Sequence, residues 1–187
     1  MKCRFILPVL AAFVCFPMYS QDNSRWCVST NAADLAYLLT LNVGAQYAFD
    51  RHFTVETRAR WNPWSFKNAG KDDFHSRQRS FSLGARWWPW YTYSGWWVGA
   101  KGQYQEYNSG GLSSSASEEG DAVGMVLSAG YSFQITKWLD IDLGLGIWGG
   151  RATYTSYECP HCGHATGSGS RAFFLPDEML VSAMFIF

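Results

Sequence analysis

This sequence has few charged residues and no excess of either sign. Charged residues make up 16% of the 187-residue chain, against roughly a quarter in typical soluble domains. The 15 basic and 15 acidic residues balance, and no stretch of the chain concentrates Lys and Arg. A nucleic-acid-binding surface needs such a basic patch. We therefore expect no nucleic-acid partner.

Long hydrophobic runs are also missing. Beyond residue 20, no stretch approaches the 18 consecutive apolar residues that predict a membrane-spanning helix. The one apolar run, at residues 5–16, is too short for such a helix. It follows Lys2 and Arg4 and precedes Ser20, which is the pattern of a secretory signal and its cleavage site. The sequence predicts a signal peptide at 1–20 and one domain at 21–187.

Three of the five cysteines, Cys27, Cys159 and Cys162, lie beyond residue 20, and their spacing leaves several interpretations open. Cys159 and Cys162 stand two residues apart beside His161 and His164, which is the spacing of zinc ligands. A second cysteine pair that would complete a zinc finger is missing. In an oxidising compartment the spacing favours a small disulfide, with a plain loop or a metal site as alternatives. Cys27 remains as an odd thiol.

Aromatic residues are abundant, at 18% of the chain with ten Trp and ten Tyr. The mean hydropathy is nevertheless slightly negative, at −0.15, so the apolar residues are diluted among polar ones. Alternation along strands produces this combination. A lipid-facing wall with two aromatic girdles can use many more rings than a small soluble core.

Apolar and polar residues alternate along most of the chain. The period of two predicts eight strands, at residues 27–37, 41–49, 53–61, 77–88, 96–106, 122–133 and 138–148, with a last strand ending at residue 187. Connections after the second, fourth and sixth strands are short, and those after the third, fifth and seventh are long. We predict an all-β fold: an eight-stranded antiparallel transmembrane barrel with short periplasmic turns and longer extracellular loops. A soluble barrel or sandwich is the alternative.

The polar face of these strands carries small residues and a few charges, so it is predicted to line the narrow interior. The predicted lumen charge network consists of Glu56, Arg58, Arg60, Arg86, Lys101, Asp140 and Asp142. The third and seventh strands face each other in a ring of eight. Arg58 and Arg60 are therefore predicted to reach Asp140 and Asp142, because buried charges must be paired. We interpret the network as a plug, with a narrow polar pore as the alternative.

The C-terminal strand ends on Phe185, Ile186 and Phe187. This ending resembles the closing strand of bacterial outer-membrane barrels. The resemblance implies that Phe185 and Phe187 form part of the signal read by the barrel-insertion machinery.

Other short motifs extend this resemblance over most of the chain. They are Thr30-Asn31, Asn42-Val43-Gly44, Trp61 with Trp64, Gly84-Ala85-Arg86-Trp87, Gly130-Tyr131-Ser132 and Gly144-Leu145-Gly146. Together they resemble an uncharacterised family of small outer-membrane barrels from gut-type Gram-negative anaerobes, and more loosely the OmpA/OmpX class. The resemblance implies a barrel in the outer membrane and no established activity.

Catalysis finds little support in the sequence. The predicted outer rim offers acidic residues and histidines at Asp72, Asp73, His75, Asp121, His161, His164, Asp177 and Glu178. Their spacing forms no Ser-His-Asp triad or carboxylate pair. We expect no enzyme and no cofactor. The expected role is structural or interactive (membrane integrity, adhesion or support of a surface assembly), with outer-membrane lipid and a surface protein or appendage as partners. A narrow pore and a rim enzyme are the alternatives.

Overall fold

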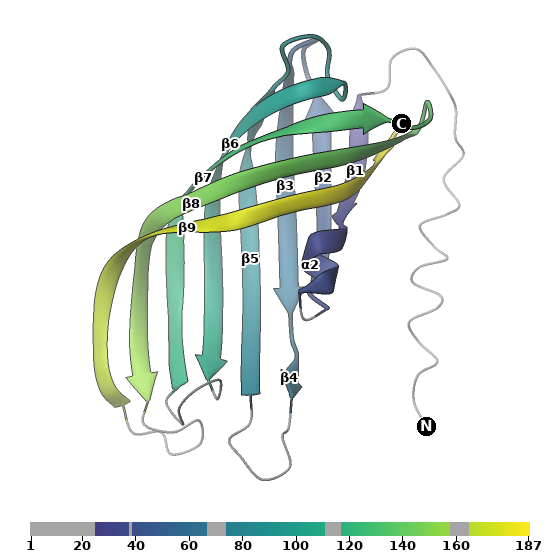
Figure 1. The fold of residues 1–187 in the computed structure, drawn as a ribbon. Helices are drawn as coiled ribbons and strands as arrows, with labels where there is room; N and C mark the ends of the chain where they lie inside the picture. The colour runs from purple at the N-terminus through teal and green to yellow at the C-terminus, as the bar shows by residue number, and fades with distance from the viewer. Residues whose placement is uncertain (1–24, 38, 67–73, 111–116, 158–164) are drawn as a thin grey trace, which may run out of the picture.

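The described chain forms one sheet that closes on itself (Figure 1). A computed structural model describes residues 25–37, 39–66, 74–110, 117–157 and 165–187. The strands are β1 (Trp26–Asn31), β2 (Leu41–Ala48), β3 (Phe53–Asn62), β4 (Ser65–Phe66), β5 (Phe74–Trp87), β6 (Gly95–Gly110), β7 (Ser117–Gln134), β8 (Leu139–Tyr157) and β9 (Ala165–Ile186). One short helix, α2 (Ala32–Ala36), follows β1.

All neighbouring strands are antiparallel, and each pairs with the next along the chain. The two-residue strand β4 pairs with β5 in continuation of β3, so the ring has eight members. Pairing of β1 with β9 closes the ring. The predicted all-β fold and the eight-stranded antiparallel barrel are confirmed.

The two faces of the sheet differ in the way that the alternation predicts. The outward face is apolar, as the exposed fractions of Leu145 (70%) and Met125 (61%) illustrate. The inward face buries charges, since Arg86 and Asp142 are 1% and 0% exposed. Charged residues are almost never fully buried unless they are paired, and Arg86 is paired with Asp142.

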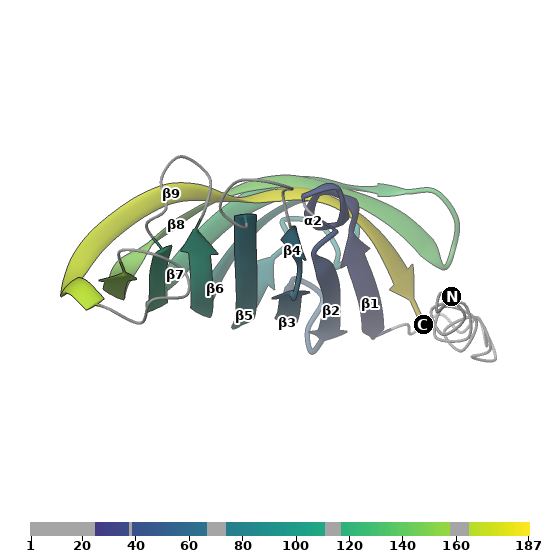
Figure 2. The same ribbon diagram turned by 90° about the horizontal axis from the view of Figure 1, so that it is seen from below.

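The barrel is strongly asymmetric. The long strands β6 to β9 bend and cross in front of the straighter β1, β2, β3 and β5 (Figures 1 and 2). In both views the first part of β9 lies at one outer side of the sheet, while β1 lies at the other. Only the last part of β9 therefore reaches β1.

The seam between β1 and β9 is short because β1 is short. The predicted strand at 27–37 is wrong beyond Asn31, where α2 begins. The Asn31 side chain accepts a hydrogen bond from Ala33 N at 3.2 Å, which is an N-cap, and alanine-rich sequence follows it. No helix among the described residues is long and apolar enough to cross a membrane.

Strands β5 to β9 are longer than predicted, whereas β2 and β3 agree with the prediction to within one residue. The segments 107–121 and 149–171 were expected to be loops, but β6 extends to Gly110, β7 starts at Ser117, β8 extends to Tyr157 and β9 starts at Ala165. Most of these added residues are polar or small, so their alternation gives no apolar period to recognise. The backbone ladder with the neighbouring strand keeps them extended.

Candidate functional site

The centre of the barrel holds a group of buried charges and one indole, here called the lumen cluster: Glu56, Arg86, Trp97, Lys101 and Asp142. Arg86 lies between two carboxylates, with Nη1 2.7 Å from Asp142 and Nε 2.5 Å from Glu56. Lys101 Nζ lies 3.9 Å from the same Glu56. Trp97 donates from Nε1 to Asp142 at 2.6 Å, and its ring lies 3.8 Å below the Arg86 guanidinium. The lumen cluster ties β3, β5, β6 and β8 together across the interior.

The remaining predicted lumen charges also face inward. Arg58 and Asp140 are 6% and 1% exposed. Arg60 lies toward the other end of the barrel, where its Nε is 3.9 Å from Asp34 and its Nη2 donates to Gln103 at 3.4 Å. Across the lumen, Asp142 is thus bonded to Arg86 of β5, whereas the sequence suggested Arg58 or Arg60 of β3. The pairing of Arg58 or Arg60 with Asp140 or Asp142 remains a prediction.

Trp97 was not recognised as an interior residue from the sequence. Its register neighbours on the next two strands are Gly130 and Gly144, and the indole fills the space that these glycines leave. A Cβ at Gly144 would lie only 2.8 Å from the Trp97 ring. The signal was present, because Trp97 has the same strand parity as Lys101, and opposing glycines on two adjacent strands make room for a large side chain.

An aromatic layer lies next to the lumen cluster, at the end of the barrel with the short turns. Trp88, Tyr93, Trp97, Cys27, Leu180 and Met184 form this buried layer. Trp88 donates to Thr54 at 3.2 Å, and the Tyr93 hydroxyl donates to the Arg25 carbonyl at 3.0 Å. Burial raises the pKa of Tyr93 well above its ordinary value, so it remains a neutral donor. The layer and the lumen cluster together fill this half of the interior.

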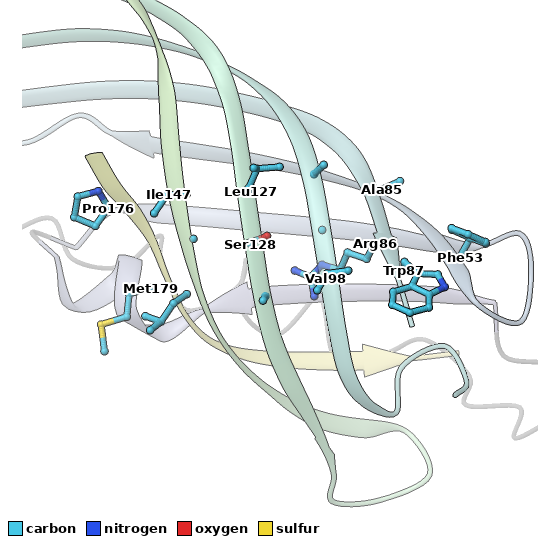
Figure 3. Close-up of a pocket in the computed structure, with 15 residues that line it drawn as sticks. Phe53, Ala85, Arg86, Trp87, Val98, Leu127, Ser128, Ile147, Pro176 and Met179 are labelled. Atoms are coloured by element: carbon cyan, nitrogen blue, oxygen red, sulfur yellow. The ribbon is translucent and has the colours of Figure 1, made fainter. Parts of the chain in front are cut away.

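The outer surface carries a wide apolar groove of about 970 Å³ (Figure 3). Much of its lining is one row of register neighbours on five adjacent strands: Ala85, Ala100, Leu127, Ile147 and Pro176. Arg86 and Ser128 also border it. The lining is almost entirely hydrocarbon, so the groove can accommodate apolar matter and offers little to a polar ligand.

A second hollow, of about 350 Å³, marks the end of the apolar surface. Its lining is charged and polar and includes Arg77, Arg79, Glu106, Glu119 and Asp121. The Tyr104 hydroxyl lies 3.0 Å from Asp121 and donates to its carboxylate. Beyond this belt the outward residues of β7 and β8 are mostly polar.

The cysteine motif cannot be placed. Cys159, His161, Cys162 and His164 lie outside the described residues. Within the described ranges, no group of three His, Cys, Asp or Glu residues could hold a metal ion, and Cys27 is a buried free thiol.

The predicted rim residues that the structure describes lie on three different strands. Asp72 and Asp73 lie outside the described residues, His75 lies in β5, Asp121 in β7, and Asp177 and Glu178 lie in β9. Of these, Asp121 is held by the Tyr104 hydroxyl. The closing-strand residues Phe185 and Phe187 are 42% and 50% exposed, and Phe185 stacks on Trp138 at 6.2 Å.

The fold and its interior define a class: small eight-stranded antiparallel barrels with an apolar exterior and a lumen filled by paired charges. The chain belongs to the family described as "Protein of unknown function (DUF3575)", whose profile matches residues 6–187. A comparison with curated protein sequences finds no match.

Proposed function

We propose that this chain is an outer-membrane barrel of a Gram-negative bacterium, closed to solutes, whose outward-facing end serves in surface interaction. The observation that carries the proposal is the inverted burial: paired charges fill the interior while Leu, Val, Ile and aromatic side chains face outward. In water this exterior would be a large apolar patch, which soluble monomers rarely expose. In a bilayer the apolar exterior would face lipid, and pairing of β1 with the last part of β9 closes the ring of strands.

Aromatic side chains support the position of the membrane. Outward-facing Phe53, Trp87, Trp96, Phe133 and Trp138 lie near the short turns. Trp61 and Tyr104 lie at the far end of the apolar band, just before the charged hollow. Two such girdles flank the lipid-facing band of outer-membrane barrels. The short turns, the start of β1 and the end of β9 would then lie on the periplasmic side, and the long connections would be extracellular.

The lumen cluster favours a structural plug over a pore. Its ion pairs and the aromatic layer occupy the interior, and an eight-stranded barrel has room for little more than its own side chains. Glu56, Arg86 and Asp142 are each at most 5% exposed, so a solute path would require breaking buried ion pairs. The role proposed is therefore membrane integrity, adhesion or support of a surface assembly.

Two measurements test the proposal together. The protein should be found in the outer-membrane fraction, and the purified protein in planar bilayers should give no sustained conductance. Steady conductance steps would support the narrow pore instead. Turnover of lipid acyl groups or peptides in detergent would support an enzyme at the rim. Recovery in the soluble fraction would contradict the membrane assignment itself.

A further inference from the structure

The first part of β9 has a free edge. Strand β9 pairs with β8 from Ala165 onward, but it pairs with β1 only over Ser182–Ile186. Asn31, at the start of α2, bonds to the β9 backbone at Met179 and Val181. Among the described residues, nothing pairs with the other side of β9 between Ala165 and Leu175. This leaves a row of backbone donors and acceptors long enough for a typical strand of 5–6 residues or more.

The free edge lies beyond the apolar band from Ala172 back to Ala165, whereas Phe174 and Leu175, 70% and 52% exposed, adjoin the band. Ala172 pairs with Arg151 of β8, where the outward apolar series that ends at Ile147 has given way to charge. From there to Ala165 the paired part of β8 is Ala152 followed by Thr, Tyr and Ser residues. In the proposed membrane orientation this segment stands in water on the extracellular side. Lipid therefore does not cover it.

The large side chains of the segment lean away from the free edge. Arg171 reaches back across β8 to Glu118 of β7, with Nη2 2.7 Å from Oε1. Phe173 packs on Trp148 of β8 with ring centroids 4.6 Å apart. Phe174 leans over Gly149, where an added Cβ would lie 3.2 Å from its ring. The backbone of the edge is thereby left accessible.

Between Gly167 and Leu175 the edge has few of the features that prevent pairing, although a register irregularity lies between Ala165 and Gly167. Natural sheets protect their edges with lysines, inward charges, prolines or bulges. Between Ala165 and Leu175 the one charge is Arg171, which is held by Glu118, and the neighbouring residues are mainly Gly, Ser and Ala. Pro176 closes the segment at one end only.

We propose that this edge, residues 165–175, is a strand-addition site for an extended, uncharged segment of another surface polypeptide. The inference rests on the proposed surface role and names the kind of partner. Backbone hydrogen bonds would give the affinity, and alternate side chains the specificity. The segment of β8 on the other side of β9 shows what fits, since it places Gly150 and Gly149 opposite Phe173 and Phe174.

A second copy of the chain fits less well. Two copies in one membrane share the direction of the membrane normal, so a twofold axis along it would bring their β9 edges together in parallel. The staggered hydrogen bonds of a parallel pair cannot be related by such an axis. An incoming segment of a different chain has no such restriction.

Pro176 indicates which amides face the free side. Proline lacks an N–H, and within sheets it occurs where that position faces away from the ladder. No register shift separates Pro176 from Gly167. By the period of two, residues 168, 170, 172 and 174 direct their N–H groups to the free edge.

The test uses the purified, folded protein in detergent and a synthetic peptide with the sequence of residues 147–157 of β8, made uncharged by the change Arg151→Ser. We expect saturable binding, with slowed hydrogen exchange at the even-numbered amides 168–174. The same peptide with proline in place of Thr153 should not bind. Ala172→Pro removes one free-edge donor and should weaken binding about tenfold, the loss expected for one hydrogen bond. Heat-modifiable migration of each variant shows that it is folded.

A matched pair of lysine variants separates the edge from the surface in general. Ser170 and Thr153 are direct register partners on the exposed face of β9 and β8. Ser170→Lys should weaken peptide binding, and Thr153→Lys should leave it unchanged. Three results would overturn the inference. The first is an equal effect of the two lysine variants on peptide binding, and the second is no binding of the peptide to the wild type. The third is protection of the edge amides from exchange in the free protein, by its own chain or by a second copy. Peptide binding in detergent does not depend on where the protein resides in the cell. A failure of the outer-membrane assignment would therefore be seen in cell fractionation and not in the binding assay.

Discussion

At the scale of single residues, Arg86 dominates the interior. It bonds to Asp142 and Glu56 and covers the Trp97 ring, while being 1% exposed. Replacing it by methionine leaves two buried carboxylates with less compensation. Such a change costs roughly 3–5 kcal/mol when the pair is fully desolvated. We expect Arg86→Met to lower the urea midpoint of unfolding markedly, as measured by tryptophan fluorescence in detergent.

Two further variants make this measurement specific. The double change of Arg86→Met with Asp142→Leu should cost less than the sum of the single changes, because the two side chains interact. Arg171→Ala breaks the pair with Glu118, whose side chains are 55% and 28% exposed, and should cost less than about 1 kcal/mol. Strict additivity at Arg86 and Asp142 would contradict the ion pair.

Gly144 tests the seating of Trp97. A methyl group there would meet the ring at 2.8 Å and the Ala129 carbonyl oxygen at 3.0 Å. Overpacking of this kind costs typically 1–3 kcal/mol, so Gly144→Ala should lower the thermal midpoint. Gly102→Ala on the exposed face is the control, since its nearest contact would be 3.9 Å away. Equal thermal midpoints for the two variants would show that the Trp97 ring can shift to accommodate the methyl group without a loss of stability.

At the scale of elements, the seam between β1 and β9 depends on Asn31. Its Oδ1 accepts from Val181 N at 2.9 Å and from Ala33 N, and its Nδ2 donates to the Met179 carbonyl at 3.0 Å. Asn31→Ala leaves buried backbone groups unpaired, at roughly 1–3 kcal/mol each when fully buried. We expect a lower unfolding midpoint, with Asn31→Asp intermediate because it keeps the acceptor.

The terminal residue closes the same seam. Phe187 exchanges two backbone hydrogen bonds with Trp26, at 2.9 and 3.1 Å. Deleting Phe187 removes both bonds and the ring, whereas Phe187→Ala removes the ring alone. If the aromatic ring guides insertion, both variants should reduce the amount of folded protein in the outer membrane equally. A defect confined to the deletion would assign the residue to seam closure.

The comparison of sequence with structure is clearest at this scale. Strict alternation located the strands from residue 41 to residue 148, because each has one apolar and one polar face. The strand at 27–37 was placed wrongly, since Asn31 and the alanines after it form a helix start that the strand pattern concealed. The count of eight strands predicted that β3 and β8 face each other across the barrel. Which of their residues lie at the same level along the barrel axis depends on the register stagger between neighbouring strands. Sequence alone does not determine that stagger, so Arg58 and Arg60 were expected to reach Asp142, and Arg86 was named only as a member of the charge network.

At the scale of the whole molecule, ring closure predicts resistance to detergent. Every strand pair is satisfied around the base of the barrel, so partial unfolding must break the seam or several ladders at once. We expect unboiled protein to migrate faster than boiled protein in a denaturing gel. Identical mobility, with no enrichment in membranes, would contradict the membrane barrel.

The short seam also sets the order of folding. Every other ladder joins strands that follow one another along the chain, but β1 and β9 lie at opposite ends of it. Bringing the ends of a segment of this length together costs on the order of 4–5 kcal/mol in chain entropy beyond a constant. The consecutive hairpins can form from local contacts first. The five residue pairs between β1 and β9 then have to offset the entropy cost of closing the ring. We therefore expect closure of the ring to be a late step of folding, and the seam to be the place where the native barrel first opens.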